Sequence, residues 1–135
     1  MTLELVPQTP GPEIYLQLRT EGGLSSYSIE AAEIGLKNSL YCVMVFDGEE
    51  PVGMGRLVGD GGCFVQVTDI VVLPGYQGQG LGKRIMAALT DYIETRLPAT
   101  AYVSLIADVP ANRLYEQFGF KETAPRSVGM SRRAR

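Results

Sequence analysis

The chain has 135 residues, a length that favours one compact domain over residues 1–135 with a single site. Hydrophobic residues make up 45% and charged residues 20%, near the averages of globular domains, so collagen-like, coiled-coil and wholly disordered classes are excluded. The net charge is −3 and there is no histidine, which excludes Ser-His-Asp and Cys-His nucleophile systems, histidine-bearing zinc sites and an imidazole base. No metal site is expected, and proton chemistry must use carboxylate, tyrosine, lysine, thiol or water.

Sequence features that would direct the chain to a membrane or to secretion are missing. The longest apolar run, Leu40 to Phe46, is far shorter than the roughly 18 residues that a transmembrane helix needs. The first residues have neither a basic start nor an apolar signal core. Cys42 and Cys63 lie in apolar, strand-like stretches without a partner at CxxC spacing, so both are expected in the core. These features predict a cytoplasmic protein that does not bind membranes.

Charge is distributed unevenly along the chain. Residues 1–69 carry ten acidic and three basic residues, net −7, whereas residues 70–135 carry five acidic and nine basic residues, net +4. A basic second half suits an anionic cofactor and an acidic first half suits a cationic substrate, although an ordinary solvated surface explains the same numbers. The sequence pI of about 4.9 disfavours nucleic-acid binding.

The first half of the chain predicts a strand, two helices and an antiparallel meander. A short strand over Leu3–Val6 is followed by a proline-rich stretch and a helix over Glu13–Thr20, with Ile14, Leu16 and Leu18 as its apolar members. Ser28 is expected to cap a helix over 29–38. Three β-rich segments then alternate with glycine-containing hairpin turns: Tyr41–Phe46, Val52–Val58 and Cys63–Leu73.

The second half predicts two helices and further strands. A helix over Gly80–Leu97 has apolar residues four apart and ends before Pro98. A buried strand over Ala101–Ala107 follows, and then a short helix over Ala111–Phe118 that Gly119 closes. The last expected strands lie near Lys121–Thr123 and Val128–Ser131.

The most informative segment runs from Ile70 to Arg84, from a strand through a glycine-rich turn into a helix. Exposed amides at a helix start bind phosphate oxygens, and glycines let the ligand approach the backbone. A mononucleotide P-loop is excluded because Gln77 and Arg84 stand where it needs Gly and Ser or Thr. A dinucleotide GxGxxG motif is excluded because Lys83 replaces its last glycine.

The hexapeptide Gln77–Gly82, QGQGLG, resembles the Q/R-x-x-G-x-G/A signature of the GNAT superfamily of acyl-CoA-dependent N-acyltransferases. The strand before it and the segment Asp108–Phe120, which is similar to that family's fourth-helix region, extend the resemblance over residues 63–120. The resemblance implies an α/β (α+β) fold: a mixed, mostly antiparallel central sheet of about six or seven strands, about four flanking helices, and strands splayed at the acyl-CoA site.

The resemblance also implies which residues bind acetyl-CoA. Main-chain groups of Ile70 and Val72 would bind the pantetheine arm, which lies like an added strand in the gap between splayed strands. Asn112 would face the cofactor from the short fourth helix, and the side chain of Lys83 would either meet a phosphate or point to solvent. The pyrophosphate would be held by the amides of Gln77, Gly78, Gln79, Gly80, Leu81, Gly82 and Lys83.

Tyr115 occupies the position at which similar enzymes place a tyrosine that donates a proton to the departing CoA thiolate. A phenol with an ordinary pKa of about 10 is neutral at pH 7 and so has a proton to give. The alternative is a tyrosine whose ring packs and whose hydroxyl merely bonds the cofactor. Asp108 stands where many family members have Asn, and it could cap the fourth helix.

The acceptor amine must lose a proton, so a base or a chain of waters is needed. Asp69 is the leading candidate, since apolar neighbours raise the pKa of a carboxylate towards neutrality. The alternative is an Asp69 bonded to backbone at a bulge or to a neighbouring side chain. Tyr27, Glu30 and Arg56 could line the acceptor pocket, but each is more simply a surface or pairing residue.

Together these features predict an acetyltransferase that moves the acetyl group of acetyl-CoA to a primary amine of a small molecule, without an acyl-enzyme and without a metal. The alternatives are a protein or peptide N-acetyltransferase and a non-catalytic module that senses acyl-CoA. Dimerisation is common in similar proteins, although nothing in the sequence marks a homodimer interface.

Overall fold

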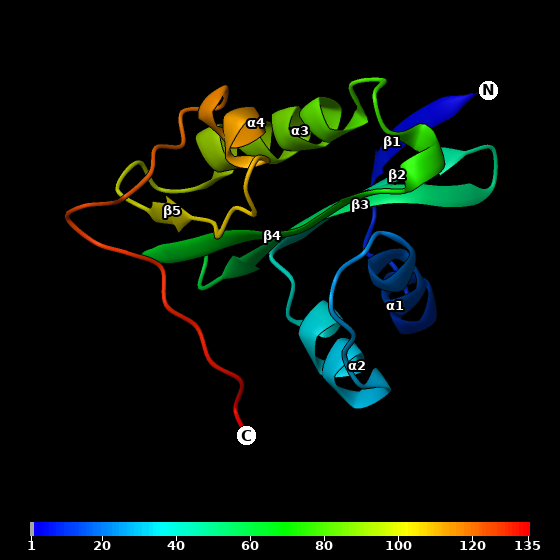
Figure 1. The fold of residues 1–135 in the computed structure, drawn as a ribbon, viewed down its shortest axis with the longest axis horizontal. Coiled ribbons are helices and arrows are strands. Elements are labelled where there is room, and N and C mark those ends of the chain that lie inside the picture. Colours follow the sequence, from blue (N-terminus) through cyan, green and yellow to red (C-terminus); the bar gives the residue numbers. More distant parts are fainter. Residues whose placement is uncertain (1) are drawn as a thin grey trace.

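A computed structural model, which describes residues 2–135, shows one five-stranded sheet between two layers of helices (Figure 1). The strands follow the order β1-β2-β3-β4-β5, and every neighbouring pair is antiparallel except β4 and β5. The predicted mixed, mostly antiparallel sheet is confirmed, with five strands instead of six or seven. The elements are β1 (Leu3–Pro7), α1 (Pro12–Glu21), α2 (Ile29–Lys37), β2 (Tyr41–Asp47), β3 (Glu50–Gly59), β4 (Phe64–Val72), the 3-10 helix η1 (Pro74–Tyr76), α3 (Leu81–Arg96), β5 (Tyr102–Ser104) and α4 (Asn112–Glu116).

The strand predictions for the last third of the chain are wrong. Residues 121–135 contain no helix or strand and are exposed throughout, so the β-prone residues near 121–123 and 128–131 have no sheet face to pack against. The strand expected over 101–107 shrinks to β5, and Tyr102 and Ile106 are 54% and 64% exposed instead of buried. The strand has a neighbour on one edge only, which limits its length and its burial.

The two N-terminal helices form where they are expected, but α1 buries a different face. Its buried residues are Tyr15, Leu18 and Arg19, spaced as one side of a helix, whereas Ile14 is 38% exposed. At the start of α2 the amide of Ala31 donates to the Ser28 hydroxyl at 3.1 Å, which confirms the predicted cap.

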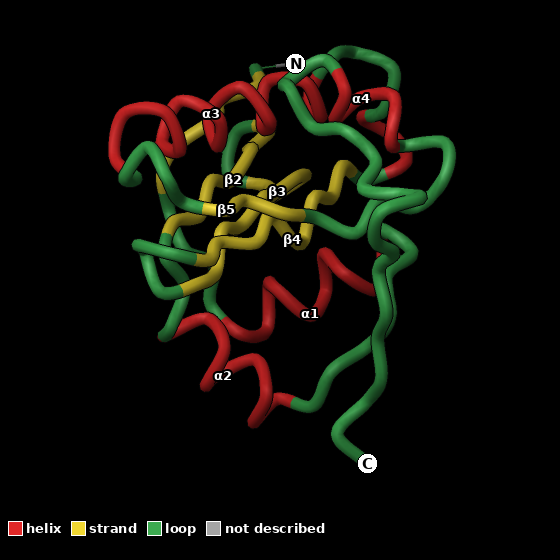
Figure 2. The backbone as a smooth tube through the Cα atoms, turned by 90° about the vertical axis from the view of Figure 1, so that its left-hand side faces the viewer, coloured by secondary structure: helices red, strands yellow, loops and turns green. Residues whose placement is uncertain are grey.

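Figure 2 shows α3 and α4 on one side of the sheet and α1 and α2 on the other. A cluster of buried hydrophobic residues lies on each face of the sheet, between it and these helices. On the first face, a Cβ added at Gly55 of β3 would lie 2.5 Å from Ile85 of α3, so helix and sheet are in close contact. Cys42 is buried as predicted, but Cys63 is exposed in the turn before β4.

A β-bulge interrupts the pairing of β3 and β4. Between the pairs Met54↔Val71 and Arg56↔Thr68, β3 has one residue and β4 has two, one of which is Asp69 with a φ of 57°. A bulge turns two consecutive side chains to one face. Thr68 and Asp69 therefore both face α1 and α2, and strand alternation resumes after them.

Strands β4 and β5 separate soon after they pair. Their parallel pairing covers only Phe64↔Tyr102, Val65↔Val103 and Gln66↔Ser104, and the chain then leaves the sheet. Within residues 2–135 the rest of β4, up to Val72, has no strand on this edge. This is the predicted splay.

Candidate active site

The glycine-rich turn between β4 and α3 is fixed at its base by two side chains. The Tyr76 hydroxyl donates to Asp47 at the end of β2 at 2.7 Å, and the Gln77 amide donates to the carbonyl of Val72 at 2.9 Å. Gly78 and Gly80 then adopt φ values of 82° and 83°, a left-handed conformation that glycine enters without strain. The sequence thus needs glycine at both positions to turn the chain directly into α3.

This turn leaves a row of backbone donors unused. The backbone amide of Gln77, which was expected to belong to this set, donates to the carbonyl of Pro74 at 3.4 Å. In the described part of the chain, the amides of residues 78–83 have no backbone acceptor, and the first helical bond runs from Arg84 to the carbonyl of Gly80 at 3.0 Å. A Cβ added at Gly78 or Gly80 would meet nothing within 4 Å, so the space beside them is open. Six free amides at the positive end of a helix dipole are an arrangement that could hold an anionic group such as a pyrophosphate.

The open edge of β4 presents main-chain groups of the residues that the sequence singled out. The amide of Leu73 donates to Val52 on β3 at 2.9 Å. Because main-chain groups alternate between the two edges of a strand, those of Ile70 and Val72 point to the opposite edge, where β5 has ended. This orientation is the one that pairing with an extended pantetheine arm requires.

Helix α4 packs against the first turn of α3, with Leu114 3.4 Å from the position of a Cβ on Gly82. Burial and then the negative charge of Asp108 raise the pKa of Tyr115, so its phenol stays protonated at neutral pH. The side chain of Asn112 donates to Glu116 at 3.4 Å. Ala111, not Asp108, is the N-cap of this helix, so the expected capping role of Asp108 is wrong.

Asp69 lies at the centre of a buried polar cluster on the other face of the sheet. One carboxylate oxygen accepts from Arg19, and the other accepts from the Tyr15 hydroxyl at 2.9 Å and from Nε of Arg56 at 2.8 Å. The expected apolar surroundings of Asp69 are wrong, because the bulge turns its side chain towards two guanidinium groups. Burial and then the charge and hydrogen bond of Asp69 raise the pKa of Tyr15 to about 12. Although burial alone would lower the pKa of Arg56, Asp69 raises it.

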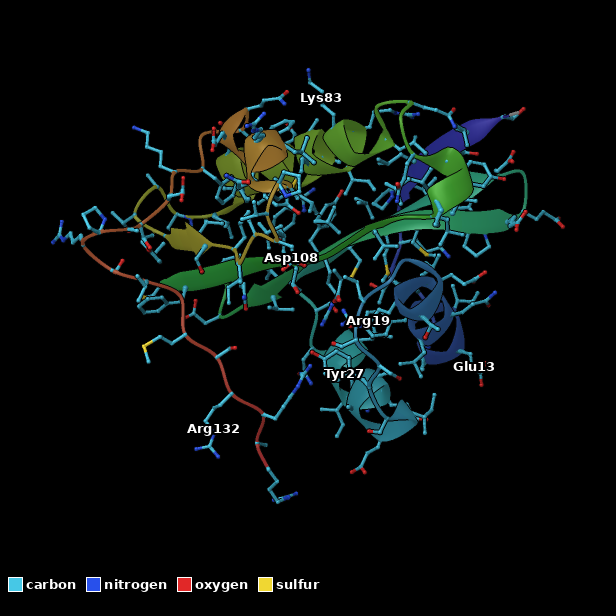
Figure 3. All side chains as sticks on the ribbon, in the orientation of Figure 1. Glu13, Arg19, Tyr27, Lys83, Asp108 and Arg132 are labelled. Atoms are coloured by element: carbon cyan, nitrogen blue, oxygen red, sulfur yellow. The ribbon has the colours of Figure 1, made fainter. Side chains whose placement is uncertain are left out.

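A cavity of about 190 Å³ lies against this cluster, between the sheet and helices α1 and α2. Figure 3 shows Arg19 and Tyr27 together on this side of the sheet, and the Arg19 guanidinium stacks 4.7 Å from the centre of the Tyr27 ring. From the C-terminal segment, Arg133 donates to the Tyr27 hydroxyl at 3.3 Å and to Ser25 at 3.1 Å. The lining residues are Tyr15, Tyr27, Ala31, Ala32, Gly35, Leu36, Arg56, Thr68 and Asp69.

Comparison with known proteins identifies this architecture. Residues 24–130 match the family model of the acetyltransferase (GNAT) domain. The chain belongs to the GNAT acetyltransferase family. The family that the glycine motif predicted is therefore confirmed.

Similar proteins support the same assignment. A protein of unknown function from meticillin-resistant Staphylococcus aureus, titled a probable acetyltransferase, has a crystal structure with a TM-score of 0.92, 44% identity, and coverage of 98% of this chain and 99% of that one. A GNAT family acetyltransferase from Streptococcus pneumoniae has a TM-score of 0.81, 29% identity and 99% coverage of both chains. An uncharacterized acetyltransferase of Streptococcus pyogenes is 28% identical over 67% of this chain, and the match spans only 61% of that relative's length.

The GNAT domain brings some predicted site residues together and separates others. Tyr27 and Arg56 join Asp69 in the small cavity, whereas Glu30 is exposed outside it. Tyr115 and Asn112 line a wider hollow of about 1140 Å³ between β5, α4 and the C-terminal segment, and the two hollows share no lining residue. Lys83 extends from the start of α3 away from the sheet (Figure 3).

Sequence reasoning missed Tyr15 and Arg19, which supply two of the contacts to Asp69. They are four residues apart on α1 and so share one helix face. Arginine is mostly exposed in proteins, so the sequence alone predicts that Arg19 lies on the surface. A buried arginine needs a partner, and Asp69 is 50 residues away in the chain. No local sequence pattern could have predicted that Arg19 and Asp69 are in contact.

A metal-binding cluster and a membrane-spanning helix are both absent from residues 2–135, the part of the chain that the structure describes. Among these residues no three His, Cys, Asp or Glu side chains come close enough to hold a metal ion. None of the helices described there is long and apolar enough to cross a bilayer.

Proposed function

We propose that this GNAT domain is an acetyl-CoA-dependent N-acetyltransferase that acts on the primary amine of a small molecule. The observation that carries the proposal is the row of free amides over residues 78–83, next to a β4 edge whose main-chain groups have no strand partner. This pair of features fits an elongated ligand with a diphosphate at one end and amide groups along its length.

Different residues of the site bind different parts of acetyl-CoA. The amides of residues 78–83 bind the diphosphate, and the main chain of Ile70 and the N–H of Val72 pair with the pantetheine arm along the open edge, since the Val72 carbonyl already accepts from Gln77. When bound, acetyl-CoA supplies a thioester carbonyl that an amine attacks directly, so no acyl-enzyme is needed. A main-chain amide near Val72 donates to the carbonyl oxygen as negative charge develops there, and fixed positions make the encounter effectively intramolecular.

Tyr115 is proposed as the acid that protonates the thiolate of CoA. Its raised pKa keeps the phenol protonated across the physiological range, so the proton is present whenever the thiolate leaves. The raised pKa also makes the phenol a weaker acid than an ordinary tyrosine, so the transfer depends on close contact between the hydroxyl and the sulfur.

The proton of the acceptor ammonium leaves to Asp69 or to a chain of waters. Three hydrogen bonds already reach Asp69, one on one carboxylate oxygen and two on the other, so a base role would use the lone-pair position that is left on the oxygen bound to Arg19. In the Asp69→Asn variant a base role predicts loss of the rise in rate with pH, whereas a water chain predicts an unchanged pH profile.

The size of the small cavity supports a small acceptor. About 190 Å³ is the volume of roughly six water molecules in the liquid, which is enough for a compact amine. The proposal also places the protein in the cytoplasm, since Cys42 and Cys63 are both free thiols. A homodimer remains a prediction.

The decisive experiment combines calorimetry with an assay of thiol release. We expect CoA to bind the protein with measurable heat, and acetyl-CoA to release free thiol when a suitable amine is present. Binding without thiol release across polyamines, arylalkylamines, amino sugars and amino acids would instead indicate an acyl-CoA sensor. Release with peptides alone would indicate a protein acetyltransferase, and the absence of CoA binding would refute the proposal.

A further inference from the structure

The polar cluster around Asp69 contains one positive charge more than negative charge. The side chains of Arg19, Arg56 and Asp69 are only 8%, 13% and 2% exposed, so two guanidinium groups share one carboxylate nearly out of water. The terminal nitrogen Nη2 of Arg56 is not fully buried, so it is open to a ligand, and the excess positive charge in these largely buried surroundings favours an anion that binds beside it.

One nitrogen of this cluster is free to bind such an anion. All three nitrogens of Arg19 donate, to Ser25 and to Asp69. Arg56 donates from Nε to Asp69 and from Nη1 to the Gly35 carbonyl at 3.1 Å and the Ser39 hydroxyl at 3.0 Å. Among residues 2–135, Nη2 of Arg56 has no acceptor, and it lies 4.0 Å from the position of a Cβ on Gly35, a residue of the cavity wall.

The remaining polar groups around the cavity also favour a negatively charged ligand. The Thr68 hydroxyl makes no hydrogen bond within the described residues and can donate into the cavity. Asp69 is the only acidic residue of the wall, and its oxygens are engaged. Glu30, Glu33 and Lys37 of α2 are exposed and do not line the cavity.

The geometry points to an acceptor amine that also carries a small oxyanion, a carboxylate or a phosphate, which binds in this cavity against Nη2 of Arg56. Thr68 and Asp69 of the cavity wall directly precede Ile70 in β4, so the inference places the amine of such a molecule towards the open edge of β4. This inference rests on the proposed function and names its substrate class. It also replaces the cationic acceptor that the acidic first half of the sequence suggested, because Arg56, which comes from that half, lines the cavity, and the acidic Asp69 beside it is paired with Arg19 and Arg56.

The test compares amines that differ only in the oxyanion. Alanine and ethylamine differ by a carboxylate, and O-phosphoethanolamine and ethanolamine differ by a phosphate. We expect kcat/KM for acetylation to be at least about 10-fold higher for the oxyanion-bearing member of one pair, the effect of one charge-assisted hydrogen bond. The pair that shows the preference identifies whether the site binds a carboxylate or a phosphate. If neither pair shows a preference, the inference is overturned.

Variants connect the preference to Arg56. In Arg56→Met we expect the preference ratio to fall to about 1, whereas general damage to the fold would lower both rates and leave the ratio unchanged. Arg56→Lys keeps the charge beside Asp69 and lacks the second terminal nitrogen, so it tests the same ratio in a protein whose buried carboxylate stays paired. Arg96→Met, on the last turn of α3, is the matched control and should leave the ratio unaltered. An unchanged ratio in both Arg56 variants overturns the inference.

A binding measurement separates this inference from the proposed function. N-acetylalanine and inorganic phosphate are titrated into the protein without CoA and followed by NMR. We expect one of them to bind, and to bind at least about 10-fold more weakly to Arg56→Met. If no amine is acetylated but this difference holds, the proposed function fails and the oxyanion site stands. If neither probe binds, or both proteins bind equally, the inference is overturned.

Discussion

Tyr115 is a residue whose chemistry can be isolated by removing a single oxygen atom. The Tyr115→Phe variant keeps the ring packed between sheet and helices but removes the proton. We expect turnover to fall by about 100-fold, the usual contribution of a positioned acid, with acetyl-CoA affinity nearly unchanged. Steady-state kinetics with both substrates saturating measures the effect, and an unaltered turnover would contradict the acid role.

Tyr15 should show its hydrogen bond to Asp69 through the pH dependence of stability. The folded state raises its pKa from 10 to about 12, so the protonated phenol is stabilised by folding. This contribution is complete below pH 10 and is lost as the pH rises through about 12.

We therefore expect Tyr15→Phe to lower the free energy of unfolding by about 1 to 3 kcal/mol at pH 7, the range for hydrogen bonds to charged groups. The difference from the wild type should shrink above pH 10. Urea unfolding at a series of pH values measures it, and Tyr102→Phe, an exposed tyrosine, is the control. A difference that stays constant above pH 10 would refute the assignment.

Under the proposed function, cofactor binding depends on one element, the turn between β4 and α3. Gly78→Ala forces a Cβ into a left-handed conformation, which costs about 1 to 2 kcal/mol of stability, and fills the space in front of the free amides. We expect CoA affinity to fall much more than the stability change explains. Gly23 has nearly the same φ, 83° against 82° at Gly78, and equally open surroundings, so Gly23→Ala should cost similar stability in urea unfolding and leave CoA binding, measured by calorimetry, intact. Equal CoA affinities of the two variants would contradict the role of this turn.

Elements that carry their own local signal were predictable from the sequence. The Ser28 cap, the α3 stripe and the QGQGLG turn each depend on residues a few positions apart, and all three lie where the sequence places them. The bulge at Asp69 comes from a mismatch between two strands, so it is invisible in either strand alone. The strand predictions beyond Gly119 were wrong because a strand forms only beside another strand, and the sequence of one segment does not show whether such a partner is within reach.

At the scale of the whole molecule, Asp69 joins the lower helical layer to the sheet, since its partners lie on α1 and β3. Asp69→Asn removes the only charge that balances Arg19 and Arg56, and we expect it to lower the free energy of unfolding by about 3 kcal/mol or more. Chemical denaturation measures the loss. Asp91→Asn, at an exposed position of α3, should change stability by less than about 0.5 kcal/mol. A small effect of Asp69→Asn would show that the layers are held by apolar contacts alone.

The single extra residue in β4 has a consequence for how this protein can change. Under the proposed function, the chain after the bulge binds coenzyme A, whereas the recipient lies in the cavity walled by α1, α2 and residues of β3 and β4. A chimaera that takes residues 12–37 and the residue at position 56 from a relative should therefore acquire that relative's choice of recipient while its affinity for coenzyme A stays the same.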